Sequence, residues 1–341
     1  MYQQHSKARR LGLGAGMGVL LASGLLAACG THTAASPVSA TAAHAAAGGH
    51  LYVTNQLDDT LSVINSRTNQ VTATVPAGTG PEGVAVTPDG SRAYIADSGS
   101  ARVSVLDTAN NKIVATVPVG KSPTGVALSP DGQFLYVANG SSNTVSVIAT
   151  RTSKVTATIP VGTSPVNLAV SHDGATVYVA DEGSANVSVI DTRANRVVRD
   201  LPAGKYPVAV AVTPDGGSVY AANEENAGVS VISARTGKIT ATIPTGEGPF
   251  DVTLAPNGQP AYVAVLGPGN VSAISTQSNR ISRTVNVGPP GTDPFDIAVT
   301  PTAIYVVSQG AGTVTVIDPS PLKITATITV GDSPYGVAVD P

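Results

Sequence analysis

Residues 120–162 read GKSPTGVALSPDGQFLYVANGSSNTVSVIATRTSKVTATIPVG, and this sequence unit occurs seven times along the chain with small changes. The period is measured by one tyrosine per repeat, spaced by 42 residues and once by 43: Tyr52, Tyr94, Tyr136, Tyr178, Tyr220, Tyr262 and Tyr305. A fixed period of this length indicates a repeat architecture rather than a set of unrelated domains.

Each repeat contains four β-type runs, GVALSP, FLYVAN, TVSVIA and KVTATIP, which are separated by turn-forming residues. No helical periodicity interrupts them, so each unit reads as four antiparallel strands, the content of one propeller blade. The body opens on a second-strand sequence, LYVTN (51–55), and closes on a first-strand sequence, GVAVDP (336–341). The sequence therefore predicts an all-β, seven-bladed β-propeller over residues 50–341, its ring closed by pairing of the N- and C-terminal strands.

The first 28 residues have the pattern of a secretory signal peptide, with three basic residues ahead of an apolar run rich in Gly, Ala and Leu. The run ends in LAAC, which resembles the bacterial lipobox. That resemblance implies that Cys29, the only cysteine, is lipidated and becomes the first residue of the mature chain. We therefore assign residues 1–28 to a lipoprotein signal peptide. Sec export is expected, and the pair Arg9-Arg10 leaves twin-arginine export open as an alternative.

Residues 29–49 carry the lipidated cysteine and an Ala/Thr/Ser-rich, almost uncharged stretch, which we interpret as a flexible tether. The expected location is the extracytoplasmic side of the cell membrane, with the lipid anchor as the contact to the bilayer. A monomer is expected, because five repeats end their fourth strand in proline, a residue that protects an edge strand from pairing with other chains.

The repeats resemble the YVTN-family propeller repeat of bacterial and archaeal cell-surface and periplasmic proteins, and Tyr52-Val53-Thr54-Asn55 matches the tetrapeptide of that name. The resemblance covers the entire body and implies a seven-bladed propeller in an extracytoplasmic setting. It implies little chemistry, since members of the family are diverse. Quinoprotein, haem-binding and lactonase propellers are looser relatives. The pattern is lost in two repeats, at Val265 and Ser308, where the final Asn or Asp is missing.

Several function classes are disfavoured by composition. The body contains two histidines, His50 and His172, and it has no Ser-His-Asp arrangement, no metal-spaced cluster and no CxxCH motif. We expect no cofactor, and the sequence leaves a channel metal undecided. After removal of the signal peptide, 16 basic residues face 22 acidic ones, a net charge of −6, so no nucleic-acid partner is expected.

Acidic and basic side chains are unequally distributed between the two faces of the expected ring. If the first strand of each blade is innermost, the loops between blades share one face, which we call the top face, with the loops that join second and third strands. That face has 13 acidic and three basic side chains, a sum of −10, whereas the opposite face sums to +3. Such a split favours cationic partners on the top face.

The candidate binding site lies where the inter-blade loops meet the channel. At the two positions after the loop proline the repeats differ, and three consecutive blades carry an aromatic residue there. The predicted ligand-binding residues are Glu82, Asn167, Phe250, Asp251, Phe295, Asp296 and Tyr335. An aromatic and acidic mouth suits a binding site, and the alternative is that the rings plug the channel entrance.

We expect the propeller to act as a ligand- or protein-binding scaffold at the cell envelope, with its partner, a cell-envelope ligand or protein, on the acidic top face. The alternative is a propeller enzyme, lactonase-like or otherwise hydrolytic, that uses Asp251 and Asp296 at the channel mouth. The binding scaffold is favoured, because the mouth carries carboxylates but no histidine and no activated nucleophile.

Overall fold

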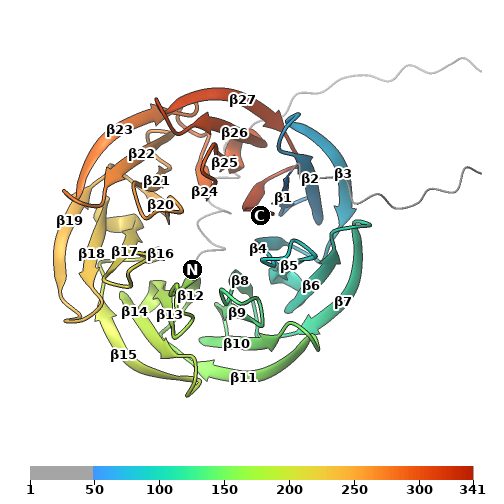
Figure 1. The fold of residues 1–341 in the computed structure, drawn as a ribbon, viewed down its shortest axis with the longest axis horizontal. Helices are drawn as coiled ribbons and strands as arrows, with labels where there is room; N and C mark the ends of the chain where they lie inside the picture. The colour runs from blue at the N-terminus through green and yellow to red at the C-terminus, as the bar shows by residue number, and fades with distance from the viewer. Residues whose placement is uncertain (1–48, 341) are drawn as a thin grey trace, which may run out of the picture. The chain divides into compact units, whose positions relative to one another are not determined.

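The computed structural model describes residues 49–340, which form seven four-stranded antiparallel sheets arranged as blades around a central axis (Figure 1). The predicted seven-bladed propeller is confirmed. Each blade begins at its innermost strand and ends at an outermost strand on the rim, as the sequence-based assignment of faces assumed.

The two channel-side strands of each blade supply the site and the core. The innermost strands are β4 (Pro81–Val86), β8 (Pro123–Leu128), β12 (Pro165–Val170), β16 (Pro207–Val212), β20 (Pro249–Leu254), β24 (Pro294–Val299) and β28 (Pro334–Val339). The second strands are β1 (His50–Asn55), β5 (Arg92–Asp97), β9 (Phe134–Asn139), β13 (Thr176–Asp181), β17 (Ser218–Asn223), β21 (Ala261–Val265) and β25 (Ile304–Ser308).

The two rim-side strands complete each sheet. The third strands are β2 (Thr60–Asn65), β6 (Arg102–Asp107), β10 (Thr144–Ala149), β14 (Asn186–Asp191), β18 (Gly228–Ser233), β22 (Asn270–Ser275) and β26 (Thr313–Asp318). The outermost strands are β3 (Gln70–Pro76), β7 (Lys112–Pro118), β11 (Lys154–Pro160), β15 (Arg196–Pro202), β19 (Ile239–Pro244), β23 (Arg280–Asn286) and β27 (Lys323–Thr329). Single 3₁₀ turns follow four of the second strands: η2 (Ser98–Ser100), η3 (Glu182–Ser184), η4 (Glu224–Asn226) and η5 (Gln309–Ala311).

The ring closes as predicted, because the last strand completes the blade that the first strand begins. β28 pairs antiparallel with β1, with Val53 opposite Val337, in the sheet order β28-β1-β2-β3. On the face opposite the top, His50 Nδ1 lies 3.2 Å from Asp340 Oδ2, and the His50 N–H donates to Asp340 Oδ1 over 2.6 Å. The two ends of the described chain therefore meet at one seam, which is the composite blade.

The core consists of seven apolar clusters, each lying between two neighbouring blades. In one of them Tyr52, Leu61 and Val63 of the composite blade pack against Ile95 and Leu106 of the next blade. The seven repeat tyrosines are all buried, with exposed fractions of 0 to 6%. Burial raises the pKa of Tyr52 to about 12. The tyrosines are therefore structural, as their periodicity indicated.

At Asn139 and Asp181, the Asn or Asp that ends the repeat motif links its blade to the preceding inter-blade loop, whereas the blades that end the motif in Val265 and Ser308 lack this link. Asn139 Oδ1 accepts from the Gly120 N–H over 3.1 Å, and its Nδ2 donates to Ser146 Oγ over 2.9 Å. In the next blade Asp181 takes the same place and accepts from Ser188 Oγ over 2.6 Å. Burial raises the pKa of Asp181 from its usual 3.8 to about 6. An amide thus performs this role without charge, whereas the carboxylate performs it at a desolvation cost.

Replacing Asp181 by Asn is expected to stabilise the propeller at neutral pH. Because the folded-state pKa of Asp181 lies above the unfolded value, its contribution to stability is fully present below pH 3.8 and is lost as the pH rises through about 6. The Asn variant lacks this loss, and we expect a gain of roughly 1–3 kcal/mol above pH 7. Urea unfolding on both sides of pH 6 measures it.

The reverse substitution, Asn139→Asp, is the matched control, and it should destabilise the chain above pH 7. Equal stability of the Asp181→Asn variant and the natural chain above pH 7 would show that burial of the Asp181 carboxylate has no net cost.

The predicted signal peptide, Cys29 and the tether up to residue 48 lie outside the described residues. Within residues 49–340, no helix has the length and apolar character that a membrane span needs.

Candidate functional site

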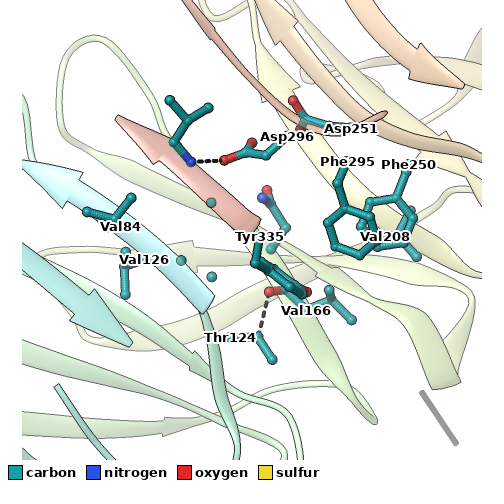
Figure 2. Close-up of a pocket in the computed structure, with 15 residues that line it drawn as sticks. Val84, Thr124, Val126, Val166, Val208, Phe250, Asp251, Phe295, Asp296 and Tyr335 are labelled. Atoms are coloured by element: carbon teal, nitrogen blue, oxygen red, sulfur yellow. Dashed lines mark hydrogen bonds between the residues drawn. The ribbon is translucent and has the colours of Figure 1, made fainter. Parts of the chain in front are cut away.

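A cavity of about 150 Å³ lies at the top end of the channel, where the innermost strands begin (Figure 2). Six of the seven residues predicted as a ligand site line it: Asn167, Phe250, Asp251, Phe295, Asp296 and Tyr335. The remaining wall comes from small and β-branched residues, including Thr124, Val166 and Val208. The structure thus brings together residues that are up to 168 positions apart, from Asn167 to Tyr335.

The three aromatic side chains form one packed cluster. The Phe250 and Phe295 ring centroids are 3.8 Å apart with 31° between the planes, and Tyr335 meets Phe295 edge-on at 4.6 Å. Their exposed fractions are 6, 6 and 8%. The cluster therefore closes one side of the channel entrance, as the plug alternative required, while it also supplies an apolar wall to the cavity.

The polar side chains of the site reach forward to the innermost strand of the next blade. Asp251 Oδ2 and Asp296 Oδ1 both accept from the Ile297 N–H, over 3.1 and 3.0 Å, and Asp296 Oδ2 accepts from the Val337 N–H over 2.7 Å. In the same way, Asn167 Oδ1 accepts from the Val210 N–H of the next blade over 3.4 Å. These N–H groups belong to channel-side strand edges, which have no further strand to pair with. Asp251 is buried and Asp296 is partly buried, and both carboxyl groups accept hydrogen bonds from backbone N–H groups.

Glycine occupies the corresponding position on the opposite side of the channel. A Cβ atom on Gly83 would lie 2.5 Å from the Thr124 carbonyl oxygen, and one on Gly336 would lie 2.5 Å from the Glu82 carbonyl oxygen. The neighbouring backbones approach too closely there for a side chain. The channel is consequently asymmetric, with closely packed backbone on one side and polar side chains on the other.

The two carboxyl groups titrate as a pair. Burial, followed by the charge of Asp296, raises the pKa of Asp251 well above its usual range, and burial raises the pKa of Asp296 to about 6. Ionisation of one carboxyl group in a desolvated site opposes ionisation of its neighbour. The first proton therefore leaves the pair more readily than the second, and the favoured ionised form of the pair carries one negative charge.

Glu82, the seventh predicted residue, does not line the cavity. It is buried behind the aromatic cluster, where its carboxyl group is hydrogen-bonded to Ser98, Gln56 and Tyr335, with Gln56 Nε2 donating over 2.9 Å. Burial raises the pKa of Glu82 to about 7. Glu82 therefore positions Tyr335 rather than meeting a ligand in the cavity.

The acidic top face is less charged than the sequence sum indicated. Five of its 13 acidic residues are buried: Glu82, Asp97, Asp181, Glu182 and Asp251. Raised pKa values further lower the charge of several of these groups. The field above the face is consequently weaker than a sum of −10 implies.

A second cavity of about 300 Å³, which was not predicted, continues down the channel. It is lined by β12, β16, β20 and β24 and shares three residues with the upper cavity, Asn167, Asp251 and Asp296. These three form a polar boundary between the two spaces. Also unpredicted were Val84 and Val126, which line the upper cavity where β-bulges shift the register of β4 and β8.

The described part of the chain contains no group of three or more His, Cys, Asp or Glu side chains that could hold a metal ion. The side chains lining the two cavities include no Lys, Arg or His. The chemistry that the walls offer is therefore aromatic contact, hydrogen-bond acceptance and proton exchange with the carboxyl pair.

Comparison with known proteins supports the fold. The model of a family described as lactonase, 7-bladed beta-propeller, matches residues 32–197, just under half of the chain. Among curated proteins, a PE-PGRS family protein of Mycobacterium tuberculosis, PE_PGRS18, is 52% identical over 50 residues. That stretch is 14% of this chain and 11% of the relative, so the chain spans only a small part of it.

Solved structures are similar at low sequence identity. A protein of unknown function from Desulfotomaculum acetoxidans has a TM-score of 0.73 at 17% identity, covering 85% of this chain and 98% of its own. Hydrazine synthase of Kuenenia stuttgartiensis has a TM-score of 0.69 at 24% identity, and the match covers 75% of this chain and 88% of that structure. The dihydro-heme d1 dehydrogenase NirN has a TM-score of 0.66 at 16% identity, and the match covers 85% of this chain and 74% of that structure. Identities of this size establish the propeller fold alone.

Proposed function

We propose that the chain is an envelope lipoprotein whose propeller binds a small ligand, or one group of a larger ligand, in the upper cavity of the channel. The observation that carries the proposal is the cavity itself. It combines three aromatic side chains with two carboxyl groups and an amide on consecutive or nearby blades. No other blade carries an aromatic residue at the first of the two positions after the loop proline, and the second is glycine or alanine in the blades that supply no carboxyl group or amide. A concave, largely apolar pocket with a few convergent polar groups is the usual form of a small-molecule site.

A thermal-shift screen of the whole chain in mild detergent tests the site. A compound bound there should raise the melting temperature, by the equivalent of about 2.7 kcal/mol at 100 times its dissociation constant. The Asp296→Asn variant should lose most of that increase, because Asp296 lines the cavity. A compound that stabilises both proteins equally binds elsewhere and contradicts the assignment.

The lipoprotein part of the proposal rests on the sequence around Cys29 and predicts membrane attachment through that residue. In a Cys29→Ala variant the lipid cannot be added, so the protein should move from the membrane fraction to the soluble fraction once the signal peptide is removed. Fractionation with immunoblotting measures this. A processed variant that stays with the membrane would rule out lipidation as the anchor.

A hydrolytic activity on a lactone is the second candidate, and the lactonase family match favours it. The carboxyl pair supplies both partners that such a reaction needs. The ionised carboxylate would take a proton from the attacking water, and the protonated carboxyl would give one to the ring oxygen as the acyl–oxygen bond breaks, leaving a hydroxy acid. Formation of hydroxy acid from a lactone panel, lost in Asp251→Asn, would favour this candidate over a pure binding module.

A further inference from the structure

We propose that the group bound in the upper cavity is a monocation, a protonated amine attached to a body about the size of one six-membered ring. This inference rests on the proposed binding function and adds the chemical class of the ligand. Three features of the cavity lead to it, namely its charge balance, its aromatic wall and its size.

The charge balance of the cavity is incomplete without a ligand. Asp251 and Asp296 share the Ile297 N–H as a hydrogen-bond donor, so their carboxyl groups are neighbours. The side chains that line the upper and lower cavities provide no positive charge near them. A desolvated negative charge is costly unless a cation or several donors compensate it, and backbone N–H groups provide only partial compensation here. One added positive charge would complete the balance, whereas an anionic ligand would be repelled.

The aromatic wall favours the same ligand. Phe250, Phe295 and Tyr335 are adjacent to the two carboxyl groups around one cavity, as Figure 2 shows. Aromatic rings attract cations through their quadrupole, and the attraction is strongest in desolvated sites. A carboxylate that accepts from an ammonium group forms a charge-assisted hydrogen bond, which is stronger than one between neutral groups. A protonated amine makes both kinds of contact at once.

The size of the cavity limits the bound group. A volume of about 150 Å³ is comparable to the engineered apolar cavity of about 150 Å³ that binds benzene. A folded protein surface cannot enter such a space, but one ring or one branched alkyl group with its amine can. The cavity therefore takes a small amine or the amine-bearing end of a longer molecule.

Benzylamine and benzyl alcohol test the inference, because they differ mainly in the charged group. In calorimetric titrations of the whole chain in mild detergent at neutral pH, benzylamine should bind at least about tenfold more tightly, equivalent to about 1.4 kcal/mol. Asp296→Asn should remove the preference for benzylamine, so that the variant binds the two probes with equal affinity. A cooperative thermal transition shows that the variant is folded.

Glu247→Gln is the matched control, since Glu247 is an exposed acidic residue on the loop just before Phe250. It should leave both affinities unchanged, so a decrease there would assign the amine preference to the general field of the top face and overturn the inference. Equal affinities of the natural chain for the two probes would overturn the monocation inference while the binding function stands. If neither benzylamine nor benzyl alcohol binds, the result would contradict the monocation inference and the proposed binding function together.

Discussion

Removal of residues 336–341 is expected to abolish cooperative folding of the propeller. The truncation takes most of β28 from the composite blade, so β1 loses its channel-side partner and the ring is open at the seam. The buried side chain of Val337 is lost from the apolar cluster that it shares with Leu51 and Val53, and Asp296 loses its hydrogen bond from the Val337 N–H. An exposed strand edge and an unfilled core between two blades are together far more costly than an ordinary C-terminal trim. Calorimetry should show no sharp transition, or one lowered by tens of degrees.

A circularly permuted chain is the matched control for this truncation. It joins residue 340 to residue 50 by a short Gly/Ser linker and opens in the exposed turn at residues 109–110. β28 and β1 remain paired in this chain, so it should melt cooperatively. If the truncated chain instead kept the natural melting temperature, closure of the ring through β28 would not contribute to stability.

Replacement of Phe295 by Ala should give the largest loss among the site residues. Phe295 is 6% exposed and lies between Phe250 and Tyr335, so its removal leaves a cavity and breaks both ring contacts. The expected loss is about 3–5 kcal/mol for a buried phenylalanine. The loss is read from the urea midpoint, with the slope of the transition held as a check on two-state unfolding.

Phe134 is the natural control, because it is the only phenylalanine outside the cluster and is 37% exposed at the start of β9. Phe134→Ala should cost well below half of the Phe295→Ala value, since less apolar surface is buried there. Similar losses in the two variants would mean that the cluster contributes no more than ordinary surface burial. A large loss of stability in Phe295→Ala would mean that this ring packs the structure, so a loss of ligand binding in the same variant could not be assigned to direct contact with the ligand.

The fold was predictable in detail because its determinants repeat. A period of 42 residues, four β-type runs per period and a blade divided between LYVTN and GVAVDP are enough to specify a closed ring of seven blades. The placement of Phe250, Phe295 and Tyr335 around one point followed from the same periodicity. Every blade projects the same position into the channel, so neighbouring repeats become neighbouring walls.

The state of the site was not predictable, because it depends on the distances between blades. The sequence does not show that Asp251 binds the Ile297 N–H or that Asp296 binds the Val337 N–H, since these contacts join neighbouring blades and residues 46 and 41 positions apart along the chain. Nor does it show that the rings contact one another rather than point into solvent. Both depend on how closely the innermost strands approach one another, and the repeat pattern does not specify that distance.

The seam between β1 and β28 also determines how the ring responds to mechanical tension. The two strands are antiparallel, and His50 and Asp340 lie side by side at the same end of the pair. A pull that separates these two ends would load the inter-strand hydrogen bonds one after another, as in opening a zipper, and would not shear them all at once. Force applied between the termini should therefore open the propeller at low load, starting from the His50–Asp340 contact, while the six other blades remain folded.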